Sequence, residues 1–174
     1  MSLFVVDVES DGPAPGLYSM VSFGAVKVDD ALDTTFYGQV SPIADDWIPE
    51  ALAVSGISRN DHLLYPNPEE TMRAFATWLT QHSKGRPVFV SDNLAFDWQF
   101  INYYLHKFTH TNPFGFSGRR IGDLYCGLMK DMGAGSVWKS LRRTPHTHNP
   151  VDDARGNAEA LVALAKQHGL RLPH

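Results

Sequence analysis

Runs of apolar residues bounded by polar and turn-forming residues predict four strands in the first half of the chain. The expected strands are Leu3–Val8, Met20–Val28, Thr35–Val40 and Pro87–Val90. The pair Asp29-Asp30 is typical of a hairpin turn between the second and third strands. Because so short a connection joins only antiparallel neighbours, we expect the early strands to run antiparallel.

Apolar residues at helical spacing predict four helices, mainly in the second half of the chain. They are Pro68–His82, Ala95–Phe108, Asp123–Met132 and Asp152–His168, with a further short helix at Ala51–Val54. Strands and helices in this order indicate an α/β fold with a mixed β-sheet flanked by α-helices. No internal repeat, linker or low-complexity tract divides the chain, so we expect a single domain over residues 1–174.

The first expected strand ends in two acids, Asp7 and Glu9, which interrupt its apolar run. Successive side chains of a strand alternate between its faces, so both carboxylates point to the same side. Like charges placed so close raise each other's pKa unless a cation lies between them. Oxygen ligands of this kind suit Mg²⁺, so the strand provides half of a metal site.

Two later segments offer acids that complete such a site. Asp97 falls in the first turn of the helix after Pro87–Val90, where the helix dipole alone would also favour an acid. His148 precedes Asp153 by an H-x4-D spacing at the start of the last helix. By this spacing Asp153 is the ligand and Asp152 caps the helix, although His148 alone is compatible with an ordinary loop histidine.

These motifs resemble the DEDDh group of 3′-to-5′ exonucleases in the ribonuclease H-like superfamily. The matching residues occur in the expected order: Asp7-x-Glu9, Asn93-x-x-Phe96-Asp97 and His148-x4-Asp153. Within that group, Asp7–Gly16 and Ser19–Val26 resemble the small single-domain 3′-to-5′ exoribonucleases known from mycobacteria. The resemblance extends from Leu3 to Leu164 and implies a ribonuclease H-like fold.

The resemblance implies that Asp7, Glu9, Asp97 and Asp153 hold two Mg²⁺ ions, for which Mn²⁺ can substitute. His148 would be the general base in hydrolysis of a 3′-terminal phosphodiester, which releases nucleoside 5′-monophosphates. The expected substrate contacts are Ser10, Asp11 and Gly12 at the terminal sugar, with Met20, Phe23, Asn93, Phe96 and Trp98 around the terminal nucleotide. The Pro-rich stretch Gly12–Gly16 departs from the tighter Thr-Gly turn of many DEDDh enzymes.

The amino-acid composition indicates the general class of protein. The 174 residues are 43% hydrophobic and 20% charged, as in an ordinary globular protein. The single cysteine, Cys126, excludes an internal disulfide and a thiolate zinc cluster. The chain starts without a basic leader and has no apolar run long enough to cross a membrane, so we expect a cytoplasmic protein that does not bind membranes.

The formal net charge of −4 is unusual for a protein that binds phosphates. Metal-bound acids would account for part of it, and an enzyme that grips a strand end needs only a local basic rim. Candidates for this rim, which would otherwise be solvated surface residues, are Arg119, Arg120, Lys139, Arg142, Arg143 and Arg155.

Several alternatives stay open. The resemblance favours RNA over DNA with a free 3′ end, but the choice depends on contacts to the 2′-hydroxyl. A hydrolase of dinucleotides or other small phosphodiesters would use the same residues. A non-catalytic nucleic-acid-binding module would lack one of the acids or the histidine, and none is missing. Relatives of this size pair to extend the binding surface, so a homodimer is a further option.

Overall fold

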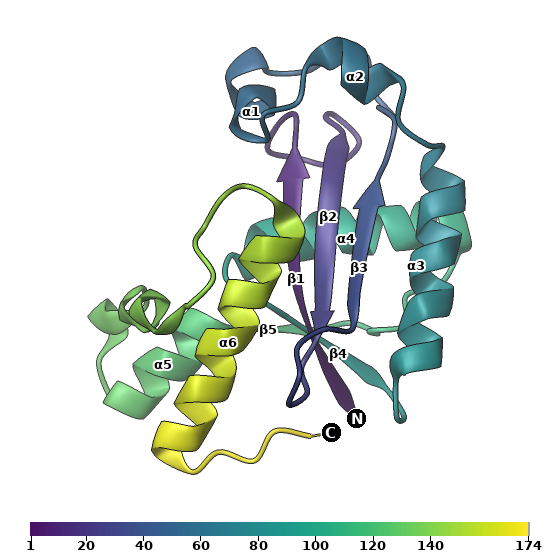
Figure 1. Cartoon of the computed structure of the whole chain (residues 1–174). Helices are drawn as coiled ribbons and strands as arrows, with labels where there is room; N and C mark the ends of the chain where they lie inside the picture. The colour runs from purple at the N-terminus through teal and green to yellow at the C-terminus, as the bar shows by residue number, and fades with distance from the viewer. Residues whose placement is uncertain (174) are drawn as a thin grey trace.

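The sheet has five strands in the order β3-β2-β1-β4-β5 (Figure 1). The computed structural model describes residues 1–173. The strands are β1 (Ser2–Ser10), β2 (Met20–Lys27), β3 (Thr35–Gln39), β4 (Pro87–Ser91) and β5 (Gly118–Arg120). β1 pairs antiparallel with β2 and parallel with β4, and β2 pairs antiparallel with β3. The sheet is therefore mixed, as predicted.

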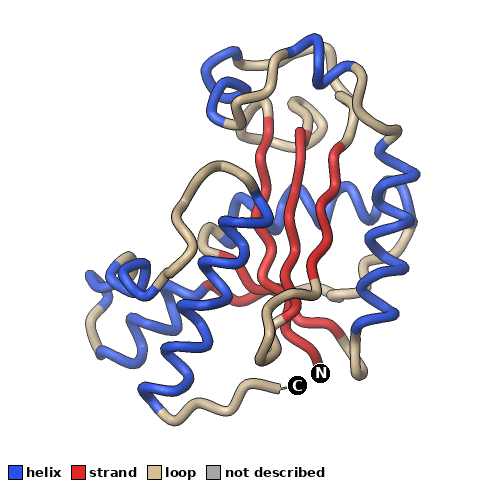
Figure 2. The backbone as a smooth tube through the Cα atoms, viewed as in Figure 1, coloured by secondary structure: helices blue, strands red, loops and turns tan. Residues whose placement is uncertain are grey.

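Helices cover both faces of this sheet (Figures 1 and 2). The α-helices are α1 (Pro49–Val54), α2 (Arg59–Leu63), α3 (Pro68–His82), α4 (Leu94–Thr109), α5 (Ile121–Met129) and α6 (Pro150–His168), and the 3₁₀ helices are η1 (Met132–Ala134) and η2 (Val137–Leu141). α3 and α4 pack on one face, and α6 with α5 on the other. α1 and α2 lie beyond the carboxyl end of β1. In residues 1–173, no helix combines the length and the apolar character needed to span a bilayer.

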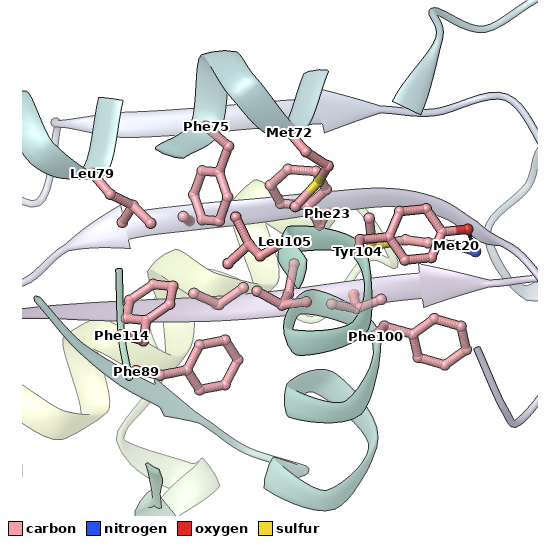
Figure 3. Packing of buried hydrophobic residues seen from close by; sticks show 14 of the residues in the cluster. Met20, Phe23, Met72, Phe75, Leu79, Phe89, Phe100, Tyr104, Leu105 and Phe114 are labelled. Atoms are coloured by element: carbon pink, nitrogen blue, oxygen red, sulfur yellow. Dashed lines mark hydrogen bonds between the residues drawn. The ribbon is translucent and has the colours of Figure 1, made fainter. Parts of the chain in front are cut away.

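Alternation along β1 decides where its two acids point. Phe4, Val6 and Val8 enter the core beneath α3 and α4, which Figure 3 shows in close view. Leu3 and Val5 enter the opposite core, beneath α6. Residues two apart in a strand share a face, so Asp7 and Glu9 also lie on the α6 side.

The start of α6 lies directly on β2. Gly24 of β2 pairs with Asp7 of β1. A Cβ built on Gly24 would come within 2.3 Å of the backbone carbonyl carbon and oxygen of Pro150. Only glycine leaves room for this close approach, which brings the first turn of α6 over the acids of β1.

We expect Gly24→Ala to lower the free energy of unfolding of the protein and to disturb the placement of the acids of β1. The Pro150 backbone would have to move away, at a cost of about 1–3 kcal/mol for an overpacked contact. Urea unfolding of the variant measures this loss. Gly127→Ala is the matched control, because a Cβ there meets nothing within 4 Å. Unchanged stability in Gly24→Ala would show that α6 does not depend on this contact.

The predicted strands and long helices are confirmed to within a few residues. α4, α5 and α6 begin one or two residues earlier than predicted, at Leu94, Ile121 and Pro150. β5 was missed because Gly118–Arg120 has no apolar run and joins the sheet through backbone pairing with β4. α2 and the 3₁₀ helices were also missed, because five residues or fewer carry no periodic pattern.

Candidate active site

A cavity of about 450 Å³ opens at the carboxyl end of β1. Its walls come from β1 and the loop after it, from α1, from the start of α4 and from the loop before α6. The lining residues are Asp7, Val8, Glu9, Ser10, Gly12, Pro13, Ala51, Val54, Asp92, Asn93, Phe96, Asp97, His146 and His148. The fold thus brings the three sequence motifs to one place.

Three of the predicted ligands form a tight cluster. Asp7, Glu9 and Asp153 each offer a carboxylate oxygen within 4.8 Å of the others. Glu9 is 8% exposed and Asp153 is 2% exposed. Burial raises the pKa of Asp7 well above its usual value, and the carboxylates of Asp97, Asp153 and Glu9 raise it further. Burial and mutual repulsion thus disfavour the charged form of Asp7 when no cation is bound.

Asp97 approaches this cluster from the first turn of α4. It is 3% exposed, and its Oδ2 has no hydrogen-bond partner among residues 1–173. Burial raises the pKa of Asp97 to about 8. A buried carboxylate oxygen without a partner is costly unless a cation binds it. These oxygen ligands fit hard divalent cations such as Mg²⁺ or Mn²⁺.

His148 faces the same acids. Its Nδ1 lies 3.4 Å from Glu9 Oε1, and its side chain is 44% exposed. Burial raises the pKa of Glu9 to about 7, although the neighbouring His148 opposes this shift. With Nδ1 directed at Glu9, the imidazole Nε2 is the nitrogen left to accept a proton from solvent or substrate.

Asp153 also fixes the loop that carries His148. Its Oδ1 accepts a hydrogen bond from Thr147 N at 2.8 Å, and its Oδ2 accepts one from His148 N at 3.0 Å. The prediction that Asp152 caps α6 was wrong. The cap is Asn149, whose Oδ1 accepts hydrogen bonds from the backbone amides of Val151 and Asp152. Asn149 immediately precedes Pro150, and that pair was the available sequence signal.

Four predicted substrate contacts are not at the cavity. Met20 and Phe23 have no exposed surface and lie in the core (Figure 3). Val21 is an extra residue where the β1–β2 register shifts, and this bulge turns Met20 to the same face as Phe23. Asp11 is fully buried and pairs with Arg59 at 2.8 Å. Trp98 packs edge-on against Phe89 and lines a separate hollow along α4.

The candidate basic rim divides into two groups. Lys139 and Arg142 both pair with Asp92, which lines the cavity. Arg142 also opposes the upward pKa shift of Asp7. The guanidinium of Arg155 donates to Leu32 O at 2.9 Å, and Arg155 does not line the cavity. The others lie at the surface: Arg143 pairs with Glu159, Arg120 pairs with Asp123, and Arg119 is exposed.

The predicted site omitted six residues that line the cavity: Val8, Pro13, Ala51, Val54, Asp92 and His146. Ala51 and Val54 of α1 form an apolar wall, and no local pattern connects this segment to the acids. His146 lies two residues before His148, and its Nδ1 is 2.9 Å from Asp153 Oδ2. The spacing His146-x-His148 was the visible signal for this residue.

The fold is that of the 3′-exonucleases of ribonuclease H-like type. The chain superimposes on cell-death related nuclease 4 with a TM-score of 0.75 at 18% identity, over 95% of this chain and 64% of that one. It superimposes on Escherichia coli exonuclease I in complex with a dA16 oligonucleotide with a TM-score of 0.70 at 14% identity, over 96% and 41%. The chain thus spans less than two thirds of each of these structures.

No protein-family model matches the chain. It is 36% identical over 175 residues to the 3′-5′ DNA exonuclease Cap18 of Escherichia coli, an alignment that covers 92% of this chain and 90% of that protein. The chain therefore belongs to the family of 3′-5′ exonucleases that includes Cap18.

Proposed function

We propose that this protein hydrolyses the 3′-terminal phosphodiester of a single-stranded polynucleotide and releases nucleoside 5′-monophosphates. The observation that carries the proposal is the cluster of Asp7, Glu9 and Asp153, with Asp97 and His148 beside it in one open cavity. Membership of the Cap18 family supports this reaction. A non-catalytic binding module would not need all five residues.

Asp7, Glu9, Asp97 and Asp153 would hold two divalent cations, Mg²⁺ or Mn²⁺. When bound, such ions supply positive charge for the phosphoryl oxygens and lower the pKa of a coordinated water. The protein's own part is to hold the four carboxylates apart from bulk water. Asp7 interacts electrostatically with the other three carboxylates. Burial of Glu9, Asp97 and Asp153 keeps the electrostatic attraction to a cation strong.

His148 is the proposed general base. Nδ1–H of His148 faces the Glu9 carboxylate, which orients the ring. Nε2 is then free to take a proton from the attacking water. Asp153 holds the backbone of Thr147 and His148, which keeps the imidazole at the mouth of the cavity. We propose that Asp153 thereby has two roles, as a metal ligand and as the anchor of the base.

The terminal nucleotide would lie between the acids and the α1 wall. Ala51, Val54 and Phe96 give the cavity apolar surface against which a base can pack. Ser10 and Gly12 also line the cavity, and we propose that they meet the terminal sugar. Asn93, at the start of α4, is the remaining proposed contact.

We propose DNA as the preferred substrate. A family member aligned over nearly the whole chain is a DNA exonuclease, and this supports DNA over the RNA favoured by the sequence motifs. RNA remains the second candidate, carried by the resemblance of Asp7–Gly16 to mycobacterial exoribonucleases. A homodimer also stays a proposal.

A gel time course tests both the reaction and the preference for DNA over RNA. Matched DNA and RNA oligonucleotides, labelled at the 5′ end, are incubated with Mg²⁺, with Mn²⁺ or with EDTA. We expect a ladder that shortens from the 3′ end only when metal is present, and faster for DNA. No shortening of either polymer, with turnover of dinucleotides alone, would replace the proposal by a small-phosphodiester hydrolase.

A further inference from the structure

A second set of metal-ligand side chains lies at the mouth of the cavity. His146, His148 and Asp153 each offer one ligand atom, and these atoms lie within 4.8 Å of one another. The rings of His146 and His148 have centroids 4.4 Å apart at 66°. Unlike the cluster of Asp7, Glu9 and Asp153, this set contains two imidazole nitrogens and one carboxylate oxygen.

The three side chains belong to one short segment that is already ordered. Asp153 accepts hydrogen bonds from the backbone of Thr147 and His148, and Asn149 caps α6 within the same segment. The histidine side chains are 50% and 44% exposed, so an ion can reach them from solvent. Binding an ion here requires little further ordering of the chain, which lowers the entropic cost.

Ligand chemistry separates this set from the acid cluster. Mg²⁺ binds oxygen and keeps its waters, whereas Zn²⁺ takes imidazole nitrogen and carboxylate oxygen in tetrahedral sites. We propose that His146, His148 and Asp153 form an inhibitory Zn²⁺ site. A water, or Glu9 near His148, completes the coordination.

Zn²⁺ at this site blocks the reaction in two ways. It occupies a ring nitrogen of His148, which then no longer moves a proton, and it withdraws Asp153 from the acid cluster. This inhibitory effect rests on the proposed function, whereas binding of Zn²⁺ does not. His146 belongs to the zinc set but is neither one of the four proposed acid ligands nor the proposed base, so substituting it weakens the zinc set while those five residues stay in place.

Calorimetric titration with ZnCl₂ in excess Mg²⁺ tests the binding directly. We expect His146→Asn and His146→Gln to bind Zn²⁺ at least about tenfold more weakly than the wild type. His168→Asn, at the exposed end of α6, is the matched control and should bind as the wild type does. In an Asp7→Asn background, the His146-dependent binding should persist. Equal Zn²⁺ affinity in the wild type and in both His146 variants would overturn the proposal.

Turnover supplies the second measurement. With Mg²⁺ alone, the rates of the wild type and of His146→Asn give the uninhibited reference for each protein. Added Zn²⁺ should inhibit the wild type at concentrations about tenfold lower than those that inhibit the variant. Equal inhibition of both would overturn the inhibitory role. If the protein cuts no polynucleotide, the proposed function fails, and the calorimetric result still decides whether the Zn²⁺ site exists.

Discussion

Asp7→Asn is expected to lower exonuclease activity by orders of magnitude while raising the melting temperature of the metal-free protein. Asp7 lies among Glu9, Asp97 and Asp153, and both burial and these carboxylates raise its pKa. A neutral side chain of the same shape removes repulsion that only a cation would otherwise offset. It also removes a metal ligand, and a loss of several kcal/mol of transition-state stabilisation lowers kcat about 10²- to 10⁴-fold.

Melting curves with EDTA and with Mg²⁺ check this prediction. In EDTA the variant should melt above the wild type. Added Mg²⁺ should raise the melting temperature of the wild type and leave the variant nearly unchanged, since binding to the folded state stabilises it. Asp152→Asn is the matched control, because it removes an acid that neighbours Asp153 in the first turn of α6 but does not line the cavity. If Asp7→Asn lowered the melting temperature in EDTA, the carboxylates would not be repelling one another.

His148→Asn is expected to lower kcat about 10²- to 10⁴-fold, the usual contribution of a general base, with little change in metal affinity. Asparagine is preferred to alanine because His148 has a φ of 61°, a left-handed conformation that asparagine tolerates better. The hydrogen bond from the backbone amide of residue 148 to the Asp153 carboxylate can then persist. The loss therefore reports on the imidazole rather than on the loop.

Single-turnover rates and Mg²⁺ titrations separate the two roles. The variant should show a slow chemical step with normal Mg²⁺ dependence. His168→Asn should retain the wild-type rate. A variant as fast as the wild type would exclude His148 as the base.

The main motifs could be read from the sequence because each depends on local spacing. The apolar run of β1 predicts a strand, and a period of two places Asp7 and Glu9 on one face. The order of the three motifs then indicated one site. The structure places Asp97 and His148 in the wall of one cavity, and Asp153 within 4.8 Å of Asp7 and Glu9. Their catalytic roles remain predictions.

The errors arose where a neighbour in space decides the environment. Met20 lies close in sequence to the first motif, yet the bulge at Val21 turns it into the core, where its amide donates to the Tyr104 hydroxyl at 2.8 Å. Trp98 follows Asp97 directly, but one step along a helix rotates a side chain by about 100° and points it away from the cavity. Adjacency in sequence therefore did not imply adjacency at the site.

The sequence by itself determined the α/β class, the long elements and the identity of the acids, because apolar periodicity and motif spacing are properties of short segments. Only the tertiary structure decided how the acids meet, through Gly24, which admits Pro150 against β2 and sets Asp153 beside Asp7. It also decided that Ala51 and Val54 form a wall and that His146 joins His148 and Asp153. Such contacts depend on the packing of segments far apart in the chain, which no local pattern records.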